Sequence, residues 1–188
     1  MRCFGDGDPL YERYHDEEWG RPQLTERQLF EKVCLEGFQA GLAWITVLRK
    51  RAALREAFGG FEPAHVADLD VEPLMADARL IRSRPKLQAC VTNARATLAL
   101  AGGLPALVVR YATDEPARER WDQVPAATPG STALAKELKR AGFTFVGPVT
   151  AYSLLQACGL VGDHLRGCDV RDEAEAERRD ALGLAPGC

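Results

Sequence analysis

Two pairs of cysteine and histidine, one near each end of the chain, supply residue types that bind metal ions. Cys3 and His15 lie near the N-terminus, and His164 and Cys168 lie near the C-terminus. On a helix, residues four positions apart share one face, which would direct His164 and Cys168 to a common point. Two thiolates and two imidazoles form the closed tetrahedral donor set of a structural Zn²⁺ site. The spacing matches no compact zinc finger, so spacing alone leaves a metal site and two chance pairs both open.

Glu36 places a carboxylate on the apolar face of a predicted helix. Counted from Leu29, the same stripe carries Val33, Glu36 and Ala40, so the side chain of Glu36 is expected to face inward. A buried carboxylate needs a partner, a raised pKa or a polar cavity. An internal ion pair with an arginine is one interpretation. The other is a pocket for a flat, electron-poor ring, built with Trp44 and nearby tyrosines.

A glycine-flanked segment predicts two helices joined by a tight hairpin. The first helix ends near Gly142, the turn passes through Val146 and Gly147, and Pro148 opens the second helix. Backbone amides at the start of such a helix can hold a DNA phosphate, which is the function of a helix-hairpin-helix element. An ordinary helical hairpin is the alternative.

The elements that must position these groups are predicted to be helices. Asp8 is placed to cap a helix over residues 9–18, residues 25–28 form a capping-box pattern, and Ser131 is expected to cap a later helix. No run alternates convincingly between apolar and polar residues. The sequence therefore predicts an all-α fold.

Length and composition fit one domain with a substantial core, since the chain has 188 residues and 46% apolar content. Residues 1–168 are interpreted as this domain and residues 169–188, rich in arginine and glutamate, as a solvated helix or disordered tail. The net charge of −3 argues mildly against a nucleic-acid partner, but basic clusters at 79–86 and 136–140 soften that argument.

The cellular location is expected to be the cytoplasm. The chain starts without the apolar core of a signal peptide, and its most apolar stretch, residues 97–109, is too short to span a bilayer. In a reducing compartment, cysteines serve as metal ligands or buried thiols more often than as disulfides. Cys34, Cys90 and Cys158 follow apolar helical patterns and are predicted to lie in the core.

Short motifs along the chain carry a family signature when taken together. They are DPLY at 8–11, YHD at 14–16, EWG at 18–20, CLEG at 34–37, QAGL at 39–42, WITVL at 44–48, FVG at 145–147, QACGLV at 156–161 and DH at 163–164. From Cys3 to Cys168 the chain closely resembles the 3-methyladenine DNA glycosylase I family, within the helix-hairpin-helix DNA glycosylase superfamily. The fold implied is a helical glycosylase fold whose zinc site joins the two ends of the chain.

The resemblance implies a DNA repair enzyme that flips 3-methyladenine out of double-stranded alkylated DNA and hydrolyses its N-glycosidic bond. Glu36 would favour the cationic base, Tyr14 would contact its edge and Trp44 would stack on its face. Tyr11 and Trp19 would complete the pocket. The same resemblance assigns a structural zinc ion to Cys3, His15, His164 and Cys168, and a wedge that fills the gap in the DNA to Gly41 and Leu42.

The residue early in the second helix of the hairpin bears on the reaction class. Relatives that also cut the strand carry a lysine early in the second helix, where this sequence has Val149. The resemblance therefore implies a monofunctional enzyme that leaves an abasic site, with the hairpin residues Gly142, Val146 and Gly147 binding DNA. Asp163 and Asp169 neighbour the zinc ligands and receive no catalytic role.

The sequence departs from the family close to Cys3, where a tryptophan usually follows. Phe4 stands there instead, and it is the remaining candidate for base stacking. A catalytically silent, zinc-containing DNA-binding module is an alternative function. A zinc hydrolase is another, although four protein ligands leave no open position for a metal-bound water. No protein partner is evident, and a monomer is expected.

Overall fold

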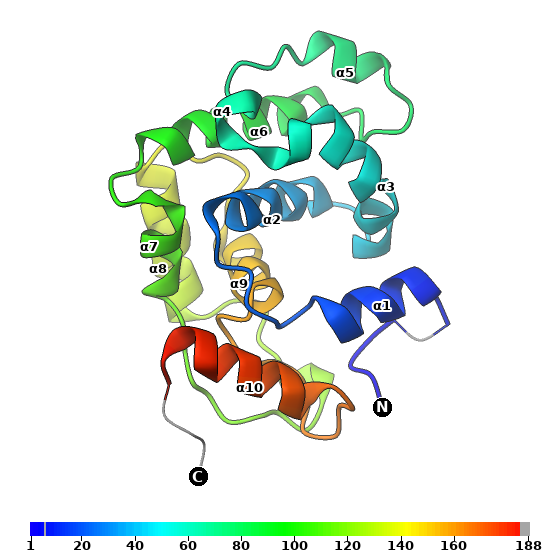
Figure 1. The fold of residues 1–188 in the computed structure, drawn as a ribbon, viewed down its shortest axis with the longest axis vertical. Helices are drawn as coiled ribbons and strands as arrows, with labels where there is room; N and C mark the ends of the chain where they lie inside the picture. Colours follow the sequence, from blue (N-terminus) through cyan, green and yellow to red (C-terminus); the bar gives the residue numbers. More distant parts are fainter. Residues whose placement is uncertain (6, 185–188) are drawn as a thin grey trace.

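The computed structural model describes residues 1–5 and 7–184, and all regular elements within them are helices (Figure 1). The predicted all-α fold is confirmed for this part of the chain. None of these helices combines the length and apolarity needed to cross a membrane. In chain order the elements are α1 (Pro9–Glu17), α2 (Glu26–Gln39), α3 (Trp44–Ala57), η1 (Gly59–Phe61), α4 (Pro63–Val66), α5 (Glu72–Ala76), α6 (Arg84–Ala99), α7 (Gly103–Val109), η2 (Trp121–Gln123), α8 (Pro129–Arg140), α9 (Pro148–Ala157) and α10 (Arg171–Leu182).

Helix α2 forms the centre of the molecule and packs against α3, η1, α6, α7 and α9 (Figure 1). It starts with the predicted capping box, in which the Thr25 hydroxyl accepts from the Gln28 amide and the Gln28 side chain accepts from the Thr25 amide. Every residue from Leu29 to Phe38 is buried. A helix buried all round must pair its polar side chains or turn them toward a cavity.

Helices α8 and α9 pack side by side and form the predicted hairpin, with Gly142 in the left-handed region at φ +95°. The hairpin is held from outside by Asn93 of α6. The Asn93 side chain accepts from the Thr144 amide at 2.8 Å and donates to the Thr144 carbonyl at 3.1 Å. These two bonds fix the turn between the helices relative to the core.

The start of α8 differs from the prediction that Ser131 caps it. The cap is Thr128, whose extended backbone lets its hydroxyl accept from the Ser131 amide at 3.1 Å. Ser131 is the third helical residue, and its hydroxyl accepts from the Thr128 amide at 2.9 Å. Pro129 at the first helical position fits the cap at Thr128.

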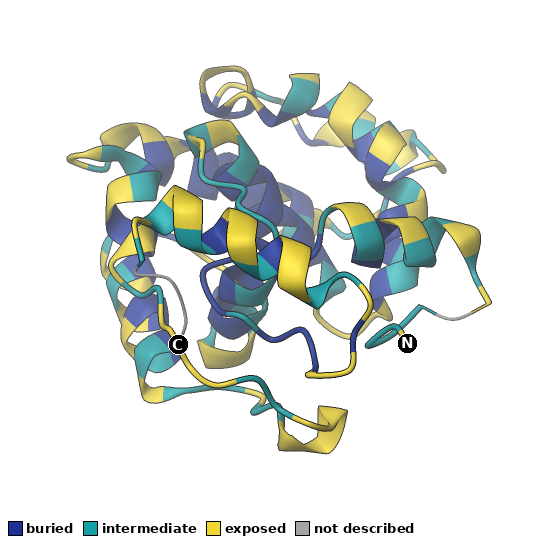
Figure 2. Ribbon diagram, turned by 60° about the horizontal axis from the view of Figure 1, so that its bottom comes forward, coloured by how far each residue is buried: buried dark blue, intermediate teal, exposed yellow. Residues whose placement is uncertain are grey.

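The segment after Cys168, for which a solvated helix or a disordered tail was expected, contains helix α10. Figure 2 brings this side of the molecule forward and shows α10 with mostly exposed and intermediate residues. Ala174 and Arg178 are nevertheless 1% exposed, since Arg178 lies against the body of the protein and donates to the Thr113 carbonyl at 2.8 Å. The segment is therefore a helix whose one edge packs against the rest of the protein, while a domain boundary at residue 168 stays a prediction.

Candidate functional site

A pocket of about 240 Å³ lies where the N-terminal segment, α1, α2, α9 and the start of α3 meet. All the residues predicted to act on a base line this one pocket: Phe4, Tyr11, Tyr14, Trp19, Glu36 and Trp44. They come from four separate stretches of sequence. The fold therefore brings together residues that the sequence analysis singled out one by one.

Glu36 is the carboxyl group of this pocket. Its side chain is buried, with 5% of the residue exposed. Among the described residues none donates a hydrogen bond to it. Burial raises the pKa of Glu36 to about 7, although the positive charge of Lys32 opposes that rise. The group is thus poised between its neutral and charged forms near neutral pH, in a place where a bound cation would favour the charge.

The pocket walls are aromatic and tilted against each other. The ring centroids of Tyr14 and Trp44 lie 5.2 Å apart, and Phe4 lies 5.0 Å from both Tyr11 and Trp19. Burial, and then the charge of Glu36, raise the pKa of Tyr14 well above its usual value, so its hydroxyl stays protonated and can donate. The buried indole N–H of Trp44 has no acceptor in the described part of the chain. The pocket thus combines flat faces with unused polar atoms.

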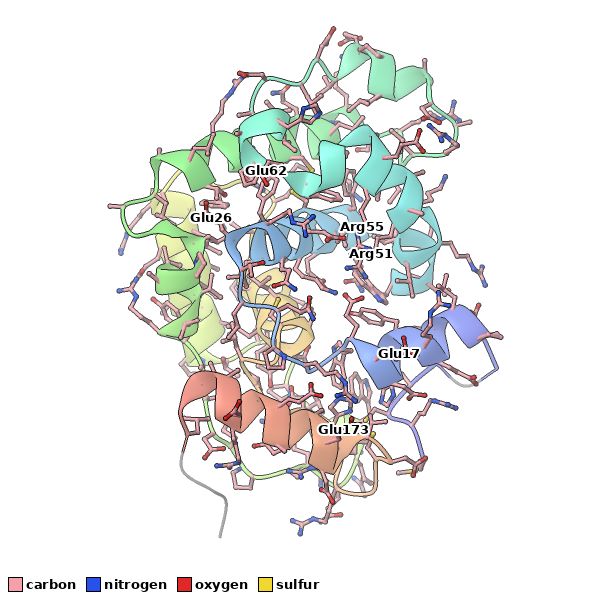
Figure 3. All side chains as sticks on the ribbon, viewed as in Figure 1. Glu17, Glu26, Arg51, Arg55, Glu62 and Glu173 are labelled. Atoms are coloured by element: carbon pink, nitrogen blue, oxygen red, sulfur yellow. The ribbon has the colours of Figure 1, made fainter. Side chains whose placement is uncertain are left out.

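A network of buried and partly buried charges lies beside the pocket, at the junction of α1, α2 and α3. Arg51 donates to Glu18 at 2.6 Å and to Glu31 at 2.7 Å, and Arg55 donates to Glu31 at 2.7 Å. Figure 3 shows Arg51 and Arg55 in the space beside α2. Lys32 donates to Glu18 and lies 4.8 Å from the centre of the Tyr14 ring. An ion pair with an arginine, which was considered for Glu36, therefore exists on α2, but it is formed by Glu31.

The ionisation of Glu18 shows how strong this network is. Burial alone would raise the pKa of Glu18, but the charges and hydrogen bonds of Lys32 and Arg51 lower it to about 2. The same kind of side chain is therefore firmly charged in the network and close to half-ionised at Glu36 in the pocket.

The pocket opens toward the turn that joins α2 to α3. A neighbouring cavity of about 230 Å³ shares Glu36 with the pocket and is lined by Gly41, Leu42 and Val149. Gly41 takes φ +75°, and Leu42 is 38% exposed at the rim. The Lys86 ammonium donates to the carbonyls of Phe38 and Ala40 at 2.9 and 2.5 Å, which fixes the end of α2 beneath this turn.

The three predicted hairpin residues lie in different environments. Gly142 makes the turn after α8, and Gly147 caps α9 with open space where a side chain would stand. Val146 is only 4% exposed, so its side chain belongs to the core. Any contact that Val146 makes with DNA would therefore come from its backbone.

The two Cys/His pairs meet at one point between the chain ends. Their ligand atoms all lie within 4.8 Å of one another, and the group could hold a metal ion. Cys168 Sγ lies 3.5 Å from His15 Nε2 and 3.4 Å from His164 Nδ1, while Cys3 Sγ lies 3.7 Å from His164 Nδ1. A tetrahedral Zn²⁺ ion separates its sulfur and nitrogen ligands by about 3.5 Å, so the donor set fits zinc.

The predicted helix through His164 and Cys168 is wrong. This stretch is a turn, closed by the Cys168 amide donating to the Leu165 carbonyl at 2.9 Å. A turn can gather two ligands four residues apart as well as a helix can. By contrast, His15 does lie on α1, four residues after Tyr11.

The imidazoles of the cluster are oriented from outside, as metal ligands usually are. His15 Nδ1 lies 2.8 Å from Asp16 Oδ1, and His164 Nε2 lies 2.9 Å from the Trp19 carbonyl. Burial lowers the pKa of His164 to about 4, which keeps the ring neutral and its Nδ1 lone pair free. The cluster adjoins the pocket, because Cys3 precedes Phe4 and His15 follows Tyr14.

Comparison with known proteins assigns the chain to a family. The sequence model of the methyladenine glycosylase family matches residues 4–172. The chain belongs to this family. It is 48% identical to DNA-3-methyladenine glycosylase 1 of Escherichia coli over 170 residues, which cover 86% of this chain and 91% of the relative.

Solved structures of methyladenine glycosylases share the fold. A crystal structure of a 3-methyladenine DNA glycosylase I has a TM-score of 0.86 at 46% identity and covers 90% of this chain and 98% of its own. The Staphylococcus aureus enzyme, in a structure concerned with 3-methyladenine recognition, has a TM-score of 0.85 at 36% identity and covers 90% and 95%.

The methyladenine glycosylase pocket also contains residues that sequence reasoning missed. Gln39 and Gln156 lie inside the QAGL and QACGLV motifs, but neither was predicted to bind the base. Trp121 opens the short helix η2, in a stretch whose sequence shows no helical period. The missed lining residues are Gln39, Trp121, Ser153 and Gln156.

Proposed function

We propose that this methyladenine glycosylase flips 3-methyladenine out of alkylated duplex DNA and hydrolyses its N-glycosidic bond in DNA repair. The observation that carries the proposal is Glu36, a buried carboxyl group without a hydrogen-bond donor in an aromatic pocket. Methylation at N3 makes the base cationic and a good leaving group. Binding and orientation can then supply much of the rate, since little acid catalysis is needed.

The pocket residues divide the work by their chemistry. The carboxylate of Glu36 stabilises the positive charge of the base, and the protonated Tyr14 hydroxyl donates to its edge. Trp44 stacks on the base, because an indole face attracts a cation. Phe4, Tyr11 and Trp19 line the pocket with Trp44 and exclude water.

DNA binding uses the surfaces next to the pocket. Extrusion of a base costs roughly a few kcal/mol, and a side chain that fills the gap offsets part of that cost. Leu42, exposed on the turn opened by Gly41, is the wedge. The turn after Gly142 and the open backbone at Gly147 supply a helix-hairpin-helix contact to a phosphate.

The reaction ends at the abasic site. A strand-cutting relative would need an amine at the start of α9, where Val149 is 57% exposed and carries none. Asp163 has no free carboxylate oxygen to offer, since one oxygen pairs with Arg118 and the other accepts from Tyr152 and Gln156 at 2.7 Å. The alternative of a second catalytic carboxylate therefore has no support.

The metal of the Cys/His cluster is a structural zinc ion. Two thiolates and two imidazoles fill a tetrahedral shell, so zinc would cross-link the chain ends and take no part in the reaction. Its removal should loosen Phe4 and Tyr14, which adjoin the ligands. Elemental analysis of never-chelated protein should give one zinc per chain, and a preparation that is folded and active without zinc would contradict this role.

The function is tested by incubating the protein with methylated duplex DNA and separating the released bases by chromatography. Release of 3-methyladenine, with strands that break only after alkali, supports a monofunctional glycosylase. Strand breaks without alkali would contradict the missing lyase activity. Duplex binding without any release by folded, zinc-loaded protein would instead indicate a silent DNA-binding module. The cytoplasmic location and the monomeric state stay predictions.

A further inference from the structure

The segment between α7 and α8 carries an aromatic side chain to the rim of the pocket. Trp121 opens the short helix η2 and lines the same pocket as Glu36, although the two residues lie 85 positions apart in the sequence. Its ring centroid lies 5.9 Å from Phe4 and 6.0 Å from Trp19. Trp121 is 46% exposed, although tryptophan side chains are highly buried on average.

The backbone around Trp121 is fixed locally. The Gln123 side chain folds back and accepts from the amides of Glu119 and Arg120 at 2.9 and 3.2 Å. One turn earlier, Arg118 pairs with the buried Asp163, and its carbonyl accepts from the Arg166 amide at 2.9 Å. The exposed indole is thus presented from a tethered segment.

Helix α10 ties this segment to the other side of the rim. Arg178 donates to the Thr113 carbonyl at 2.8 Å, and Arg179 donates to Asp114 at 2.6 Å. On its opposite flank α10 pairs with Arg21, two residues after Trp19, through Glu173 at 2.9 Å. The loops that carry Trp19 and Trp121 are therefore both held by one helix, most of which lies beyond residue 172, where the family match ends.

We infer that Trp121 is a further base-binding residue, which closes the rim of the pocket against the flipped base. The inference rests on the proposed function. An indole that is exposed in the free protein and adjoins two pocket aromatics gains contact area when a flat cation enters. Because the contact is made with bound base and transition state alike, Trp121 acts on affinity more than on the chemical step.

The test compares Trp121→Ala, Trp121→Leu and Trp121→Phe with the wild type. Calorimetric titration with free 3-methyladenine and steady-state excision from methylated duplex are the two measurements. Loss of one base–aromatic contact should weaken base binding about tenfold in the Ala and Leu variants and raise KM more than it lowers kcat. The Phe variant should recover most of the affinity. Leu98→Ala, at an exposed position on α6, is the matched control and should match the wild type.

The outcomes separate this inference from the proposed function. Wild-type protein that neither binds nor releases 3-methyladenine overturns the function itself. Wild-type affinity in the Leu variant, whose side chain keeps apolar volume but has no ring, overturns the role of Trp121. If the Ala variant unfolds, the Leu variant alone tests the role of Trp121 in base binding. Equal thermal unfolding and zinc content in the Leu variant and the wild type show that the pocket itself is intact.

Discussion

Helix α2 carries two buried glutamates that lie in opposite surroundings. Glu31 is 6% exposed and accepts from Arg51 and Arg55, within the charge network beside the pocket. Glu36 is 5% exposed and has no hydrogen-bond donor among the described residues. A fully paired carboxylate stabilises the junction of α2 and α3, whereas an unpaired one raises the energy of the free protein and keeps its charge for a ligand.

The different surroundings of Glu31 and Glu36 show which buried carboxylate is available to bind a ligand. The arginines of α3 neutralise Glu31 and, through Arg51, Glu18 as well. The positive charges of these arginines are therefore paired within the network. The pocket around Glu36 keeps a single carboxyl group, for which a cationic base would be the missing partner. Replacing each carboxylate in turn tests whether the two differ in this way.

The largest effect on stability is expected at Glu31. Glu31→Gln leaves the buried Arg51 and the half-exposed Arg55 facing a neutral amide, while Arg51 keeps Glu18, so the free energy of unfolding should fall by about 2–3 kcal/mol. Denaturant unfolding at pH 7.5 measures it. Glu17→Gln, an exposed position on α1 close by, is the control and should change little. A loss of similar size at Glu17 would show that the network is not what stabilises this junction.

A pH profile of excision should expose the ionisation of Glu36. Because the pKa of Glu36 is raised to about 7 and the carboxylate is the form that binds a cation, base release should slow as the pH falls below 7. The loss should approach about tenfold per pH unit, reaching roughly a hundredfold near pH 5. Single-turnover rates on methylated duplex measure it. A profile that is flat from pH 8 to pH 5 would contradict the assignment.

A smaller, opposite effect on stability is expected when Glu36 itself is replaced. The folded-state pKa of Glu36 lies above its unfolded value, so Glu36 costs no stability below pH 4.5 and lowers the stability of the wild type as the pH rises from there through 7. Glu36→Gln removes this loss and should stabilise the protein by about 1–3 kcal/mol at pH 8, with the gain disappearing below pH 4.5. Destabilisation at pH 8 would mean that Glu36 has a structural partner.

Sequence periodicity predicted Glu36 but not Glu31, for a physical reason. Glu36 lies on the apolar stripe of α2, which one amphipathic face is enough to reveal. Glu31 lies off that stripe and is buried because α3 covers the other side of α2, and such long-range packing leaves no local pattern. Trp44 and the nearby tyrosines were proposed beside Glu36 from the residues themselves, whereas Trp19 and Phe4 came from the resemblance to a family.

Other positions show where local spacing fails to determine geometry. His164 and Cys168 were expected on a helix, and the turn that holds them satisfies the same spacing. Trp121 was missed because its segment shows no period in the sequence. Its place at the rim depends on contacts made elsewhere in that segment, where Arg118 pairs with Asp163 and the Thr113 carbonyl accepts from Arg178 of α10.

Release of 3-methyladenine from methylated duplex DNA, measured with Glu36→Gln and Glu31→Gln side by side, decides which buried carboxylate acts on the base. Both variants are assayed at a temperature where each is folded, at equal concentrations of folded protein. We expect Glu36→Gln to lose at least about a hundredfold in rate and Glu31→Gln to keep the wild-type rate. A wild-type rate in Glu36→Gln, or equal losses in both variants, would contradict the assignment of Glu36 as the working carboxylate.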